Sequence, residues 1–83
     1  MIVVDKVTMI EFRGEQFEQV HGNPFDRGSA DSYYGRPEDP HWYPEGSYKG
    51  TRVESEQMSM AELRAYYAGY EYNEQFGDKK NWR

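Results

Sequence analysis

The chain contains very few aliphatic side chains, and this scarcity limits most strongly what it can fold into. Its 83 residues include one Leu, two Ile and five Val, against eight Tyr, four Phe and two Trp. A chain of this length buries only about 60% of the surface that it exposes when unfolded, so its core is marginal. Each buried aromatic side chain, however, removes roughly 150–250 Å² from water. We therefore predict a single small domain over residues 1–83 with an aromatic core, open to completion by a partner or a second copy.

Residues 2–20 predict a β-hairpin. Apolar and polar side chains alternate around Val7 and Met9, which is typical of a half-buried strand. Arg13 and Gly14 predict the turn, and the return strand carries Phe17. Because an isolated hairpin is barely stable in water, we expect it to pack on helices or to pair with another chain. Pairing through an exposed strand edge makes a homodimer, or a larger structural homo-oligomer, one alternative.

A first helix is predicted over residues 24–34. Asn23 is a good N-cap residue, Pro24 suits the first helical position and Asp26 favours the positive end of the helix dipole. Gly35 suits the left-handed position that ends a helix, and Pro37 prevents the helix from continuing.

A second helix is predicted over residues 60–76, after a loop over 36–58 that is rich in proline and aromatic residues. Ser59 and Glu62 have the spacing of a capping box. Gly77 ends the helix, and residues 77–83 form a basic tail. The predicted fold class is therefore α+β: an N-terminal β-hairpin, two helices and a Pro/aromatic-rich loop.

Two stripes on the second helix could each face the core. Met60, Leu63, Tyr67 and Tyr70 follow 3-4-3 spacing and share one face. A neighbouring face carries only small residues: Ala61, Ala65, Ala68 and Gly69. Since glycine inside a helix costs roughly 1 kcal/mol relative to alanine, Gly69 indicates a close approach. We expect this small face to touch the small patch of the first helix, which comprises Gly28, Ser29 and Ser32.

The sequence favours a binding protein over an enzyme. It has no cysteine, no G-x-S-x-G elbow and no glycine-rich phosphate loop with a lysine. Its two histidines, His21 and His41, do not follow a metal-ligand spacing. We therefore predict no catalytic residues, no metal and no cofactor. The early charges at Asp5 and Lys6 argue against a signal peptide, no apolar run approaches the ~18 residues of a membrane span, and we expect a cytoplasmic protein.

Aromatic and acidic residues are the predicted contacts of this binding protein. Trp and Tyr are frequent hot-spot residues, and prolines restrict the 36–58 loop before binding, which lowers the entropy lost on association. Residues 54–78 carry six acidic residues and one Arg, so the net charge of −5 favours a basic protein partner over nucleic acid. The predicted contact residues are Trp42, Tyr43, Tyr48, Tyr66, Tyr72, Glu62, Glu71 and Glu74.

Four segments give the chain a family resemblance: residues 23–28 (NPFDRG), 34–36 (YGR), 40–44 (PHWYP) and 65–71 (AYYAGYE). Their residue types and spacing resemble those of small uncharacterised proteins encoded by tailed bacteriophages, over about residues 22–82. The resemblance implies a phage context, in which proteins of this size often bind and inhibit or redirect a host protein, and a location in the host cytoplasm. A fainter similarity is to ribosome modulation factor, a basic family that binds ribosomal RNA. It implies the alternative of a ribosome- or nucleic-acid-associated protein that uses Lys79, Lys80 and Arg83.

Overall fold

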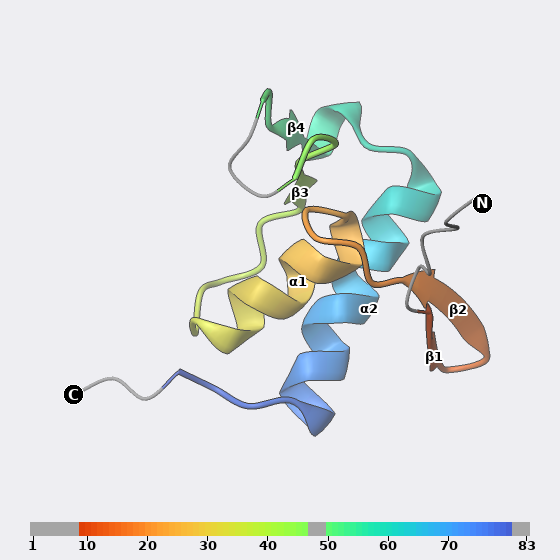
Figure 1. Ribbon diagram of the computed structural model, residues 1–83, viewed down its shortest axis with the longest axis vertical. Helices are drawn as coiled ribbons and strands as arrows, with labels where there is room; N and C mark the ends of the chain where they lie inside the picture. The colour runs from red at the N-terminus through yellow and green to blue at the C-terminus, as the bar shows by residue number, and fades with distance from the viewer. Residues whose placement is uncertain (1–8, 47–49, 81–83) are drawn as a thin grey trace, which may run out of the picture.

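The computed structural model describes residues 9–46 and 50–80 and shows a small α+β domain with an N-terminal hairpin and two crossing helices (Figure 1). This confirms the predicted fold class. Residues 2–8 of the predicted hairpin and 81–83 of the predicted tail lie outside the described residues. In chain order the elements are β1 (Met9–Phe12), β2 (Glu15–Glu18), α1 (Pro24–Tyr33), β3 (His41–Trp42), β4 (Val53–Glu54), the 3₁₀ helix η1 (Ser55–Gln57) and α2 (Met60–Phe76).

The hairpin forms where the sequence predicts it. β1 and β2 pair antiparallel, with Ile10 opposite Phe17. The two loop residues, Arg13 and Gly14, have φ angles of 55° and 78°. Positive φ at both positions matches the right-handed twist of the flanking strands. The short loop therefore fixes the register that places Ile10, Phe12 and Phe17 against the helices.

The helices α1 and α2 cross through glycine, as the small-residue faces predict. A Cβ atom added at Gly28 would lie 2.8 Å from the backbone nitrogen of Tyr70. A Cβ added at Gly69 would overlap the backbone carbonyl of Phe25. Ser29 adds a hydrogen bond from its hydroxyl to the Gly69 carbonyl, at 3.0 Å. The two backbones therefore meet at a distance that only glycine allows.

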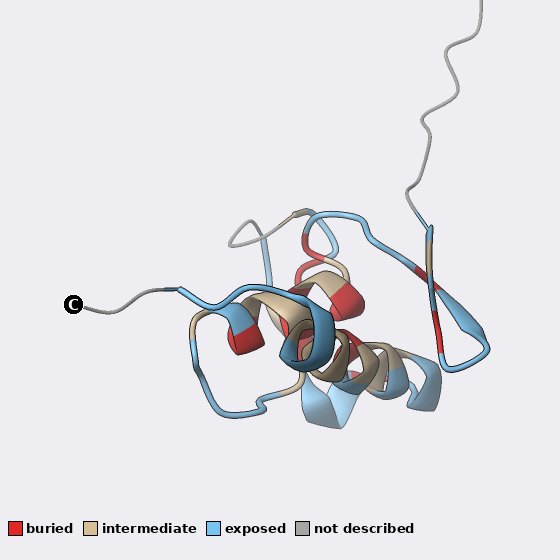
Figure 2. Cartoon of the chain, turned by 90° about the horizontal axis from the view of Figure 1, so that it is seen from below, coloured by how far each residue is buried: buried red, intermediate tan, exposed pale blue. Residues whose placement is uncertain are grey.

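The core beside this crossing consists of aromatic rings. Phe17 stacks on Phe25 with centroids 5.2 Å apart, and Phe12 meets Tyr72 edge-on at 5.6 Å. Ala65 and Ala68 complete the contact from α2. In Figure 2 the buried residues gather on α1, in the middle of α2 and on the hairpin. The aromatic core that the composition predicts is thus built by the hairpin closing over both helices.

The helix boundaries agree with prediction to within one residue, but one capping detail is wrong. The predicted side-chain cap from Asn23 does not form; its amide nitrogen lies 3.4 Å from Glu18 Oε2. Asp26, in the first turn, accepts the N–H of Gly22, which precedes the N-cap residue, at 2.9 Å. Gly35 is left-handed, with φ 69°, as expected at the end of α1. Ser59 and Glu62 form the predicted capping box of α2.

The segment predicted as loop over 36–58 contains more structure than expected. β3 and β4 pair antiparallel, with His41 opposite Glu54 and Trp42 opposite Val53, and η1 follows directly. Residues 51–58, within this predicted loop, include β4, η1 and the buried Met58. The sequence does not reveal this order because long-range contacts, above all those of His41, hold the segment in place.

Candidate functional site

The outward face of α2 carries the apolar stripe that its spacing would assign to the core. We call Met60, Leu63, Tyr67 and Tyr70 the outer stripe. Met60 is 76% exposed and Tyr67 44% exposed, while Leu63 and Tyr70 are half-buried. The small face of α2, and not the outer stripe, therefore packs against α1 at the helix crossing. Gly69 permits a closer helix approach than the outer stripe does, so packing at the crossing turns the larger side chains outward.

The prediction that Tyr66 is a surface contact is wrong. Tyr66 is 0% exposed and is the largest fully buried side chain among the described residues. It lies three residues before Gly69, so the helix crossing buries it. Tyr72 is half-buried and packs against Phe12 and Phe25, which makes it largely a core residue. Tyr67, which is not among the predicted contact residues, is the exposed tyrosine at the centre of the outer stripe.

The aromatic residues of the 36–58 segment are mostly covered. Tyr43 is buried and its ring packs edge-on against His41 at 5.6 Å. Trp42 is half-buried in β3. Tyr48 lies outside the described residues. Tyr43 is therefore a poor candidate for a large surface contact, and Trp42 offers only part of its ring.

The three predicted acidic contacts each have an intramolecular role. Glu62 belongs to the capping box. Glu71 pairs with Arg13 of the hairpin turn. Glu74 pairs with Lys79 and accepts the Ser32 hydroxyl at 2.7 Å, and these two hydrogen bonds hold the pKa of Glu74 below its usual value. Glu71 and Glu74 remain about half exposed, with 45% and 41% of their side-chain surfaces accessible, so both can still face a partner.

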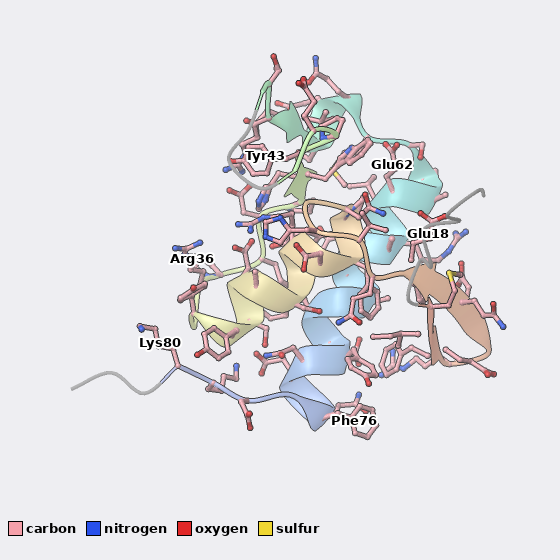
Figure 3. The ribbon with its side chains drawn as sticks, viewed as in Figure 1. Glu18, Arg36, Tyr43, Glu62, Phe76 and Lys80 are labelled. Carbon is pink, nitrogen blue, oxygen red and sulfur yellow. The ribbon has the colours of Figure 1, made fainter. Side chains whose placement is uncertain are left out.

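Two hollows flank the outward surface of α2, and Glu71 lines both. The first, of about 240 Å³, lies between α2 and the hairpin; Phe12, Phe17, Tyr67 and Ala68 form its apolar part, and the charged residues Arg13, Glu15, Arg64 and Glu71 complete its lining. The second, of about 460 Å³, is open and acidic; its lining residues are Pro37, Glu38, Tyr70, Glu71 and Glu74. We call them the apolar hollow and the acidic hollow. Figure 3 labels Glu62 near the start of α2 and Phe76 at its end, which bracket this surface.

A buried polar network lies on the other side of the helix crossing, and the sequence did not predict it. The Tyr66 hydroxyl donates to a carboxylate oxygen of Asp31 and accepts the backbone N–H of Asp39 at 2.9 Å. Burial and then the hydrogen bond to Asp31 raise the pKa of Tyr66 far above its ordinary range. Tyr66 therefore stays protonated and links both helices to the segment after α1.

His41 and Arg27 extend this network. Arg27 donates its Nε–H to His41 Nε2 at 3.1 Å, so that ring nitrogen must be an acceptor. His41 Nδ1 then carries the proton and donates to the Asp39 carbonyl at 2.7 Å. Both side chains are buried. The one sequence signal for this group is the i, i+4 spacing of Arg27 and Asp31, which places them on one face of α1.

Comparisons with other proteins add no family to this description. The chain matches no protein-family model, no curated protein and no solved structure. Among the residues that the structure describes, no three His, Asp or Glu side chains come close enough together to hold a metal ion. No helix in the same part of the chain is both long enough and apolar enough to span a membrane.

Proposed function

We propose that the protein is a non-catalytic binding protein that inhibits or modulates a host protein, in the manner of a small phage protein, in the host cytoplasm. One observation carries the proposal: Met60 and Tyr67 of the outer stripe are exposed, and Leu63 and Tyr70 are only half-buried, although the spacing is that of a buried helix face. This chain has few aliphatic side chains, and the exposed Met60 and Tyr67 do not contribute to its core. Exposed apolar side chains gathered on one face are typical of an interaction surface.

The charge around the stripe indicates the chemistry of the partner. The chain carries a net charge of −5, and the acidic hollow presents Glu38, Glu71 and Glu74 beside the Tyr70 ring. A lysine or arginine side chain fits this lining by charge and by contact with an aromatic face. The adjoining apolar hollow suits an aliphatic or aromatic side chain. We therefore propose a basic protein partner that places an apolar side chain in the apolar hollow and a cationic side chain in the acidic hollow, on either side of Glu71.

The proposal is tested by comparing two double variants as bait and then by measuring affinity for the captured partner. Met60→Gln with Tyr67→Ser removes the exposed part of the outer stripe. Met9→Gln with Val20→Ser is the matched control, because both residues are exposed apolar side chains that do not belong to α2. We expect the stripe variant to weaken binding at least about tenfold, which corresponds to about 1.4 kcal/mol, and the control to bind as the parent does. Equal binding by both double variants would refute the role of the stripe.

The same experiment separates the alternatives. Recovery that disappears after nuclease treatment would indicate a ribosome- or nucleic-acid-associated protein instead. Recovery of the chain alone, together with a dimer mass in solution, would indicate a homo-oligomer. For a basic partner, Glu71→Gln with Glu74→Gln should slow association and reduce its dependence on salt, because exposed charges steer encounter more than they hold the complex. Glu62 is left unchanged in this test, since it caps α2.

A further inference from the structure

A third hollow, of about 320 Å³, opens between α1 and the segment that follows it, and three arginines line it. Arg27 comes from α1, Arg36 follows the glycine that ends α1, and Arg52 precedes β4. In Figure 3, Arg36 and Tyr43 lie on one side of α1 and Glu18 of the hairpin lies on the other. The hollow is therefore separate from the apolar hollow, which lies between α2 and the hairpin.

We propose that this arginine hollow binds the phosphate group of a small molecule. Guanidinium groups match phosphate oxygens in pairs, which makes arginine the residue of choice for planar, bidentate recognition of phosphate. Three of them converge here against two lining carboxylates, those of Asp31 and Asp39. The groups that line the hollow thus carry one more positive than negative charge, and Glu54, outside the lining, pairs with Arg52 at 3.0 Å. The volume of the hollow is at the lower end of the range of small-molecule sites, which suits phosphate or a small phosphate ester.

The floor of the hollow is fixed before any ligand arrives. Arg27 is only 4% exposed, its Nε–H is held by His41, and its guanidinium carbon lies 5.6 Å from the centre of the Tyr43 ring. His41 is in turn held by the Asp39 carbonyl. Burying a charged side chain is costly, and this chain has a marginal core. A rigid buried cation at the base of a hollow is the arrangement that a preorganised anion site requires.

Arg52, at the rim of the hollow, can exchange its partners at little cost. It binds Asp39 at 2.7 Å and Glu54 at 3.0 Å, and the side chains of these two acidic residues are 64% and 51% exposed. Exposed ion pairs of this kind contribute little to stability. Arg36 is half exposed and lies 3.6 Å from the buried carboxylate of Asp31. A phosphate group can therefore replace the Asp39 carboxylate at Arg52 while the floor stays unchanged.

Titration of the ¹⁵N-labelled full chain with inorganic phosphate at constant ionic strength tests the proposal. We expect saturable shifts of the signals from residues around Arg27, Arg36 and His41, with a Kd of about 1 mM or tighter. Acetate is the comparison anion, because its carboxylate has fewer oxygen atoms and less negative charge than phosphate. Shifts that do not saturate, or equal affinity for acetate, would overturn the assignment of a phosphate site.

Charge-removing variants distinguish a built site from general attraction. Arg36→Gln with Arg52→Gln should weaken phosphate binding at least about tenfold, whereas Arg13→Gln with Arg64→Gln removes the same charge from exposed positions on the hairpin side and should change it less than about twofold. Equal losses in both double variants would overturn the proposal. If the rim double variant unfolds, Arg52→Gln alone, checked by its melting temperature, supplies the same comparison.

Discussion

Replacing Gly69 by alanine should destabilise the protein, although intrinsic helix propensity predicts the opposite. Alanine is favoured over glycine inside a helix by roughly 1 kcal/mol. The added Cβ, however, would lie closer than 3.0 Å to the Phe25 carbonyl, and a backbone group cannot rotate away. Overpacking of this kind costs about 1–3 kcal/mol, occasionally more. Moving the helices apart also weakens the Ser29 hydrogen bond to Gly69, worth about 0.5–1.5 kcal/mol.

The net effect is a loss of about 1–3 kcal/mol, which is a large part of the total stability of a small domain. In a domain of this size each 1 kcal/mol shifts the melting temperature by about 4–8 °C. Thermal unfolding followed by circular dichroism, with urea unfolding as a second measure, gives both values. Gln75→Ala is the control, since Gln75 is exposed on the same helix and should change stability by less than about 0.5 kcal/mol. A Gly69→Ala variant as stable as the parent, or more stable, would refute the close crossing.

Three further outcomes follow from the structure. Tyr66→Phe should cost about 1–3 kcal/mol in urea unfolding, because it leaves the Asp31 carboxylate and the Asp39 N–H without their buried partner; an unchanged midpoint would contradict this role. Since the pKa of Tyr66 is raised in the folded state above its ordinary value of 10.0, its contribution is complete below about pH 10 and is lost as the pH rises further. An alkaline absorbance titration should therefore show one tyrosine that ionises only on unfolding, and eight equivalent tyrosines would contradict it. Gly14→Ala should cost about 1 kcal/mol or more, because φ is 78° at that position, and a melting temperature equal to that of the parent would argue against the positive-φ turn.

Local signals in the sequence were sufficient for the hairpin, for α1 and α2 and for the helix crossing. The Arg13-Gly14 turn, the Ser59 capping box and the left-handed Gly35 each depend on a few neighbouring residues, and all three are present. The crossing was predictable because glycine inside a helix is costly and must be explained by a close approach. Gly28 and Gly69 meet this expectation directly.

The orientation of side chains on α2 was not predictable in the same way. Apolar spacing identified two faces but not which one the rest of the chain would cover, so the buried Tyr66 was predicted as a contact residue and the exposed Tyr67 was not. The buried network of Arg27, Asp31 and His41 was missed for a related reason. Its members come from α1 and from a proline-rich segment, and only the folded chain brings them together.

Capture of a partner by three matched chains would show whether the outer stripe of α2 is a surface for a basic protein. The parent chain, the Met60→Gln/Tyr67→Ser variant and the Met9→Gln/Val20→Ser control would each be used to capture proteins from nuclease-treated bacterial lysate. We expect one stoichiometric basic protein that the parent and the control retain and the stripe variant loses. If the stripe variant retains that protein, with all three chains folded, the outer stripe is not the binding surface.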